Sequence, residues 1–179
     1  MSKLPNLFKQ KLYAHLQPED ITEAPEDLLH YGRDWTRFAD PAPALVVFPR
    51  SANEVKKIVR LARKSKIALV PSGGRTGLSG GAVASNGEIV VSMERMRKVL
   101  AVNTTDRTIT VEAGVVTAAV QAAAKEAGLQ YPVDFASSGS SQIGGNIATN
   151  AGGINVIRYG MTRNWVAGLR VVTGAGEIL

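Results

Sequence analysis

The chain has 179 residues and a formal net charge of +6 at pH 7, a size that suits one domain or slightly more. Its composition, 45% hydrophobic and 20% charged, excludes a disordered protein, and the absence of cysteine excludes disulfides and thiolate metal sites. No apolar run approaches the ~20 residues of a membrane span, and the N-terminus lacks the apolar core of a signal peptide. We therefore expect a soluble, cytoplasmic protein with no membrane span and no metal.

The first 40 residues are expected to form a peripheral N-terminal extension. A short amphipathic stretch, Leu7–Leu16, is followed by a segment interrupted by prolines. Both histidines of the chain, His15 and His30, lie in this part. We interpret them as surface residues, and two histidines are too few for a multi-histidine metal site.

A β-α-β unit is predicted next. The valine-rich run Ala44–Phe48 predicts a buried strand, and Ser51 followed three residues later by Glu54 predicts a capping box at the start of a helix over residues 52–65. The run Ile67–Val70 predicts a second strand, parallel to the first.

The densest basic residues fall on the outer face of the predicted helix, between Lys56 and Lys66. An amphipathic helix with a solvated basic face accounts for this pattern. No aromatic side chains interleave with these charges, so a platform for stacking nucleic-acid bases is poorly supported. We expect no nucleic-acid partner.

The remaining elements predict an α+β fold class. Three short runs are expected to form antiparallel strands: Glu88–Ser92, Val99–Asn103 and Thr108–Glu112. An alanine-rich helix is predicted from Thr117 to a left-handed cap at Gly128. A final strand, Leu169–Thr173, is expected to begin a hairpin at the end of the chain.

Ten of the 18 glycines lie in two segments, the first glycine loop (Ser72–Gly81) and the second glycine loop (Ser137–Gly153), five in each. Glycine in the first loop permits positive φ and lets bare amides converge on an anion, with Arg75 as the cation, which suits a diphosphate. The alternative is a wide turn that is merely rich in glycine. The chain has neither a Walker lysine motif nor a G-x-G-x-x-G motif, which disfavours those two nucleotide sites.

The second glycine loop carries almost no charge and can approach a flat polar ring closely. Its main-chain donors and the side chains of Asn146, Thr149 and Asn150 suit the edge of a ring such as an isoalloxazine. The alternative is a mobile surface loop. Against that alternative, Ile143, Ile147 and Ala148 are spaced as the inner face of a short helix that begins near Gly144.

Two segments carry a resemblance to a known family. The first is VVFPRSANEVKKIVRLARKSKIALVPSGGRTGLSGG, which resembles the start of the flavin-binding domain of the FAD-linked oxidases related to vanillyl-alcohol oxidase. The second is YPVDFASSGSSQIGGNIATNAGGINVIRYGMTRNWVAGLRVVTGAGEIL, which is similar to the D-lactate, glycolate and D-2-hydroxyglutarate dehydrogenase branch. The resemblance covers about Tyr31 to Leu179.

The resemblance implies the residues that bind FAD. The pyrophosphate would be wrapped, largely by backbone amides, at Ser72, Gly73, Gly74, Arg75, Thr76 and Gly77. The approach to the flavin maps to Pro132 and Asp134. The isoalloxazine and the ribityl chain would contact Gly139, Ser140, Gly144, Gly145, Thr149, Asn150 and Gly152. The strand Gly168–Thr173 would lie near the adenine, and the FAD would be non-covalent because neither loop contains histidine or cysteine.

The resemblance also implies a function. Residues 41–179 would form an incomplete FAD-binding domain in which a β-α-β unit precedes a mixed or antiparallel sheet. The protein would oxidise a D-2-hydroxy acid to the 2-oxo acid by hydride transfer to the flavin, and pass the electrons to an acceptor that the sequence does not identify. In relatives a later cap domain supplies the substrate-binding groups, so we assign no catalytic residue and expect the chain alone to be inactive. The alternative is a non-catalytic module that binds an anion or a nucleotide.

Overall fold

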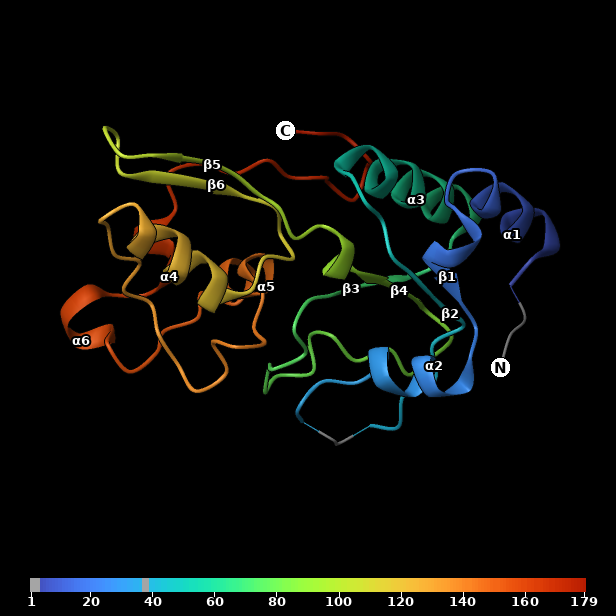
Figure 1. Ribbon diagram of the computed structural model, residues 1–179. Coiled ribbons are helices and arrows are strands. Elements are labelled where there is room, and N and C mark those ends of the chain that lie inside the picture. The colour runs from blue at the N-terminus through green and yellow to red at the C-terminus, as the bar shows by residue number, and fades with distance from the viewer. Residues whose placement is uncertain (1–3, 37–38) are drawn as a thin grey trace. The chain divides into compact units, whose positions relative to one another are not determined.

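The computed structural model describes residues 4–36 and 39–179, and the chain divides into two compact units. Unit 1 comprises Met1–Arg95 and Arg170–Leu179, and unit 2 comprises Met96–Leu169. Both units contain helices and strands (Figure 1), so the predicted α+β fold class is confirmed.

Unit 1 contains a four-stranded sheet in the order β1-β2-β4-β3. Its strands are β1 (Ile21–Thr22), β2 (Leu45–Val47), β3 (Leu69–Ser72) and β4 (Ile89–Ser92). Strands β2 and β3 are both parallel to β4, and β1 is antiparallel to β2. The predicted parallel pair is therefore confirmed, with β4 between its members. The antiparallel prediction for residues 88–92 is wrong, because β4 is buried between two strands that both run parallel to it.

Three helices cover the sheet of unit 1: α1 (Asn6–Tyr13), α2 (Pro25–Tyr31) and α3 (Ala52–Ser65). Of two short 3₁₀ turns, η1 (Pro18–Asp20) lies between α1 and α2 in the sequence, and η2 (Met93–Arg95) follows β4. The predicted bounds of α3 are confirmed, and the Ser51 hydroxyl accepts the Glu54 amide at 3.2 Å. The predicted capping box is only half formed, because the Glu54 carboxylate accepts the amide of Arg50 instead of that of Ser51.

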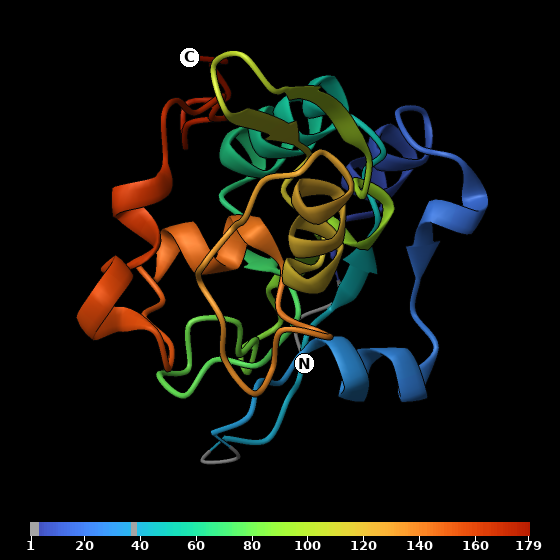
Figure 2. The same ribbon diagram turned by 60° about the vertical axis from the view of Figure 1, so that its left-hand side comes forward.

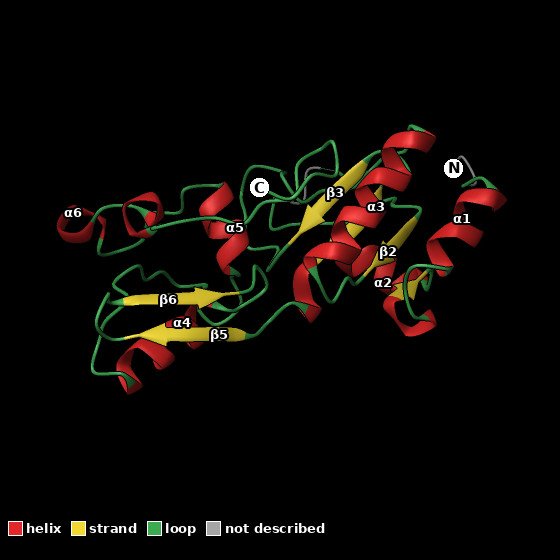
Figure 3. Cartoon of the chain, turned by 90° about the horizontal axis from the view of Figure 1, so that it is seen from above, coloured by secondary structure: helices red, strands yellow, loops and turns green. Residues whose placement is uncertain are grey.

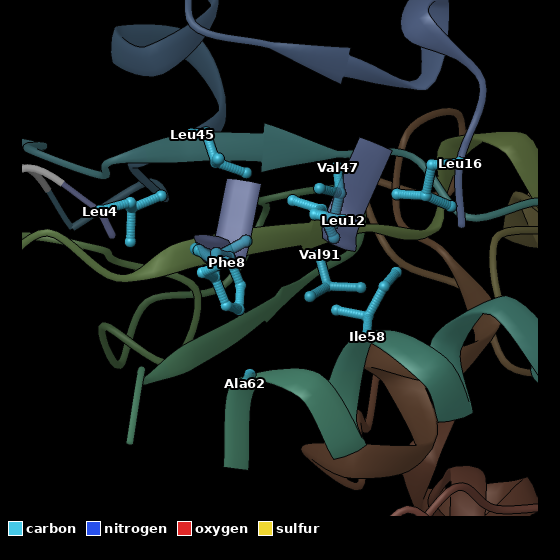
Figure 4. Packing of buried hydrophobic residues seen from close by; sticks show 10 residues of the cluster. Leu4, Phe8, Leu12, Leu16, Leu45, Val47, Ile58, Ala62 and Val91 are labelled. Atoms are coloured by element: carbon cyan, nitrogen blue, oxygen red, sulfur yellow. The ribbon is translucent and has the colours of Figure 1, made fainter. Parts of the chain in front are cut away.

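The two faces of this sheet have separate cores. On one face Phe8 and Leu12 of α1 and Ile58 of α3 pack against β2 and β4 (Figure 4). On the other face Val46 and Val90 pack with partly buried side chains of α2. The stretch expected to be peripheral therefore supplies buried core residues, since its apolar side chains meet the sheet. A domain boundary at residue 40 stays a prediction.

A buried carboxylate ties the N-terminal part to this sheet. Asp20, in η1, is almost fully buried and accepts the Nε–H of Arg50 at 2.9 Å. Its carboxylate also pairs with Arg95, at the end of η2. Because a buried charge is stable only when paired, these two arginines fix η1 beside the strand ends.

Unit 2 begins with an antiparallel hairpin of β5 (Val99–Asn103) and β6 (Thr108–Val111), against which α4 (Thr117–Glu126) packs (Figure 3). Gly128 ends this segment with φ 71°, as predicted. The chain continues through an irregular segment, then α5 (Ile143–Ala148), α6 (Val156–Tyr159) and the turn η3 (Thr162–Trp165), which are orange to red in Figure 2.

The C-terminal residues form the predicted hairpin, although as a single bridge between Val172 and Ile178 and not as a regular strand. In unit 1 this hairpin is held by Arg60, whose Nε–H donates to the carbonyl of Gly176 at 2.9 Å. Among the residues that the structure describes, no helix is both long and apolar enough to cross a membrane.

Candidate functional site

The first glycine loop starts from a buried hydroxyl. Ser72, the last residue of β3, lies opposite Ser92 of β4 and is almost fully buried. Its Oγ has no hydrogen-bond partner among the described residues. A buried hydroxyl without a hydrogen-bond partner lowers the stability of a folded protein. The Ser72 hydroxyl therefore fits a bound anionic group that accepts a hydrogen bond from it.

The left-handed backbone in this loop falls on one glycine and on Arg75, which the sequence analysis expected only to bind the pyrophosphate as its cation. Arg75 has φ 56° and Gly80 has φ 75°. Gly73, Gly74 and Gly77 lie outside this region of φ, so positive φ is not the reason for glycine at these three positions. For Gly77 the reason is not crowding either, because an added Cβ would have its nearest neighbour, Oδ2 of Asp34, at 3.9 Å.

The far end of the first glycine loop rests on a segment that the sequence analysis placed in the peripheral extension. The amide of Trp35 donates to the carbonyl of Gly77 at 3.2 Å. Asp34 is buried, and its Oδ1 accepts the amide and the hydroxyl of Thr36 at 2.9 and 2.6 Å. Asp34 was not selected from the sequence, because no sequence motif includes it. Only the fold brings this residue close to the first glycine loop.

Arg75 is bound to other groups of unit 1. Its Nη1 donates to the carbonyl of Gly73 at 3.1 Å, and its Nη2 donates to Oε1 of Glu94 at 3.1 Å and lies 2.8 Å from Nε2 of His30. The guanidinium lies 4.5 Å from the centre of the Tyr31 ring. Burial and the hydrogen bond that the Tyr31 hydroxyl donates to Glu94 raise the pKa of Tyr31 to about 12.

The second glycine loop is held by main-chain hydrogen bonds to the segment between β6 and α4. The amides of Ile143 and Gly144 donate to the carbonyls of Val115 and Ala113 at 2.9 and 2.8 Å. A Cβ added at Gly144 would lie 2.9 Å from the Cβ of Ala113. Glycine is therefore required at this position so that two stretches of backbone can approach each other.

The side chains expected at a ring edge are engaged inside unit 2. Asn146 is buried and its side-chain amide donates to the Thr117 hydroxyl at 2.7 Å. The Thr149 hydroxyl donates to the carbonyl of Gly145 at 2.9 Å, and the amide of Arg163 donates to the side chain of Asn150.

The predicted short helix is confirmed as α5, with Ile143 buried on its inner face. Ile147 is partly buried and packs against the same core. Ala148 is exposed, so its placement on the inner face is wrong, and Asn146 takes that place.

A cleft of about 490 Å³ lies within unit 2 beside the predicted approach to the flavin, at Pro132 and Asp134. Asn155 donates to the carbonyl of Pro132 at 3.1 Å, and the amide of Ile154 donates to the carbonyl of Asp134 at 2.9 Å. Burial raises the pKa of Tyr131, which also lines this cleft.

The remaining predicted residues of the second loop differ in how closely they are packed. Cβ atoms added at Gly139 and Gly145 would meet nothing within 4 Å, so these two positions are open. Ser140 donates its hydroxyl to the carbonyl of Ser137 at 3.3 Å. A Cβ added at Gly152 would lie 3.7 Å from Cγ2 of Val156, an ordinary van der Waals contact.

Gln142, which the sequence analysis did not select, is a further candidate. It directly precedes α5 and is almost fully buried, and its Oε1 has no partner among the described residues. An unpaired buried acceptor fits a ligand that offers an N–H group, such as the polar edge of a flavin ring. Within the described part of the chain, no group of three His, Asp or Glu side chains is placed to hold a metal ion.

Comparison with known families places both glycine loops in one matched segment. Residues 43–179 match the family model described as FAD binding domain. Residue identity is 64% over 155 residues with the D-2-hydroxyglutarate dehydrogenase of Xanthomonas citri pv. viticola, covering 87% of this chain and 33% of that protein. It is 59% over 164 residues with the enzyme of the same name from Stutzerimonas stutzeri, covering 92% of this chain and 35% of that protein.

Solved structures share the fold. An alkyldihydroxyacetonephosphate synthase superposes with a TM-score of 0.90 at 25% identity, over 99% of this chain and 38% of the synthase chain. The chain thus spans about a third of the length of the curated relatives that it matches.

Proposed function

Because the chain belongs to the FAD binding domain family, we propose that it is the flavin-binding part of an oxidoreductase that oxidises a D-2-hydroxy acid to the 2-oxo acid. The observation that carries this proposal is the single match over residues 43–179, which includes both glycine loops. The two D-2-hydroxyglutarate dehydrogenases at 59 and 64% identity support the substrate class.

We propose that FAD is bound without a covalent bond, since neither glycine loop contains histidine or cysteine. The pyrophosphate would be held at Ser72, Gly73, Gly74, Thr76 and Gly77, with Arg75 in a supporting part. The flavin would be held at Pro132, Asp134, Gly139, Ser140, Gly144, Gly145, Thr149, Asn150 and Gly152. Gln142 joins this second group as an acceptor.

When bound, FAD supplies the two-electron acceptor for oxidation of the hydroxyl-bearing carbon of the substrate. The role of this chain is to bind FAD and to orient it. The Ser72 hydroxyl, which has no protein partner, would donate to a phosphate oxygen, and the bare amides after it would add further donors. The Gln142 side chain would accept an N–H of the ring and so fix its orientation.

We assign no catalytic residue in this chain. Substrate binding is proposed to depend on residues outside the matched segment, because the chain spans about a third of its curated relatives. The cytoplasmic location stays a prediction of the sequence, which does not identify the electron acceptor.

A titration of the chain with FAD, FMN and ADP tests the proposal, with flavin fluorescence and calorimetry as readouts. Tight binding of FAD with much weaker binding of ADP is the expected result, since both ends of the cofactor are recognised. Equal affinity for FAD and ADP would instead support a non-catalytic nucleotide-binding module. The control is Gly81→Ala, because Gly81 lies outside the residues assigned to the pyrophosphate and a Cβ there meets nothing within 4 Å, so neither binding nor folding should change.

A further inference from the structure

The first glycine loop turns at an arginine. Arg75 has φ 56°, a region that L residues avoid because the Cβ crowds the backbone carbonyl. Such a conformation persists only where surrounding contacts outweigh the strain. The contacts of the Arg75 side chain are therefore among those that must offset this strain.

Those contacts come from three places in unit 1. The guanidinium donates back to the carbonyl of Gly73 in its own loop and to Glu94 in η2, and it stacks on Tyr31 at the end of α2. The side chain of Arg75 is only 13% exposed. A planar fork with several donors can satisfy these partners together, whereas the single ammonium group of a lysine cannot.

The charge of Arg75 is already matched. Glu94 accepts from Arg75 through Oε1 and from the Tyr31 hydroxyl through Oε2, the latter at 2.7 Å, so the carboxylate is fixed from two sides. The Tyr31 hydroxyl is protonated at neutral pH, as in any tyrosine, and its raised pKa keeps it a donor at higher pH as well. A diphosphate beside this loop would meet a neutral ion pair and not a free cation.

We propose that Arg75 is a positioning residue, which holds the first glycine loop in its binding shape through Glu94 and Tyr31 and does not itself contact the phosphate. The inference rests on the proposed function, because it assigns a role toward the FAD diphosphate. It replaces the sequence-based expectation that Arg75 supplies the cation of the site.

Two substitutions test it by titration of the chain with FAD. Arg75→Lys keeps the positive charge but loses the planar guanidinium with its several N–H donors. Glu94→Gln removes the carboxylate that accepts a hydrogen bond from this guanidinium. Both should weaken FAD binding by about tenfold or more, the usual effect of losing a hydrogen bond to a charged group. For Arg75→Lys, which conserves the charge, the dependence of affinity on salt should not change. Arg63→Lys is the matched control, because Arg63 is exposed on α3 and its replacement should leave binding unaltered.

A direct phosphate contact gives the opposite results. If Arg75 binds the phosphate, Glu94→Gln frees the guanidinium and tightens FAD binding. Arg75→Lys then keeps most of the affinity, and Arg75→Met reduces the salt dependence. Either pattern would overturn the inference.

A measurement without FAD separates this inference from the proposed function. Leu78 is 73% exposed in the first glycine loop, so chymotrypsin cleavage after Leu78 reports how firmly the loop is held. Both variants should be cleaved faster than the unsubstituted chain, and equal rates would overturn the positioning role. Failure of the unsubstituted chain to bind FAD would instead overturn the proposed function. If Glu94→Gln does not fold by circular dichroism, Tyr31→Phe should give a smaller change in the same direction.

Discussion

The two glycine loops are held in different ways. Side chains hold the first loop, since Arg75 reaches out of it to Glu94 and Tyr31, which other elements of unit 1 supply. The backbone holds the second loop, where the amides of Ile143 and Gly144 donate to carbonyls of the preceding segment. The first loop should therefore respond to changes of charge and pH, and the second to an atom added at its crowded glycines, Gly144 and Gly153.

Gly153→Ala should have the largest effect, because it tests the backbone-held loop at its most crowded glycine. Gly153 has φ 112°, and an added Cβ would overlap the carbonyl oxygen of Asp134. Left-handed strain and a clash with backbone together should cost roughly 3 kcal/mol or more. Urea denaturation measures the loss. The control is Gly168→Ala, where a Cβ meets nothing within 4 Å, and equal stability of both variants would refute the comparison.

Gly144→Ala should have the next largest effect. The new Cβ would lie 2.9 Å from the Cβ and 3.1 Å from the carbonyl oxygen of Ala113, so we expect a loss of about 1–3 kcal/mol from overpacking. Ala113→Gly removes one of these two contacts and should restore part of the loss. A double-mutant cycle from urea midpoints measures this coupling, and strictly additive losses would show that the close approach is not the cause.

These differences explain what could be predicted from the sequence. Helix α3 was predicted from end to end because its cap and its apolar stripe are local in the chain. The position of β4 between β2 and β3 was missed, because a short apolar run does not identify its partners. Left-handed backbone in the first loop was expected at glycines and occurs at Gly80, but it also falls on Arg75, whose conformation depends on contacts distant in sequence. The crowding at Gly153 has the same origin, since Asp134 reaches it only in the fold.

Tyr31→Phe should have a smaller effect, confined to the loop that side chains hold. Losing the hydrogen bond to Glu94 should cost about 1 kcal/mol at pH 8. Burial raises the pKa of Tyr31 to about 12, with further upward contributions from Glu94 and Asp27 against a downward one from Arg75.

The sign of the pH dependence follows from this raised pKa. The stabilisation by protonated Tyr31 is complete below pH 10, the ordinary pKa of tyrosine, and is lost as the pH rises through about 12. The urea midpoints of the unsubstituted chain and of the Tyr31→Phe variant should therefore converge as the pH rises from 9 to 12. Parallel curves would mean that Tyr31 does not stabilise unit 1 through its proton.

Gly77→Ala should have the smallest effect on stability and is for that reason the sharpest probe of binding. Gly77 lies outside the left-handed region, and an added Cβ would come no closer than 3.9 Å to Asp34, so the free energy of unfolding should change by less than about 0.5 kcal/mol. If the loop amides contact the diphosphate, the new methyl group would stand where the ligand approaches, and FAD affinity should fall at least about tenfold, or 1.4 kcal/mol. A calorimetric titration beside the Gly81→Ala control measures the difference. Unchanged affinity would mean that Gly77 does not lie beside the bound diphosphate. It would count against the assignment of the first glycine loop as the site of the FAD pyrophosphate.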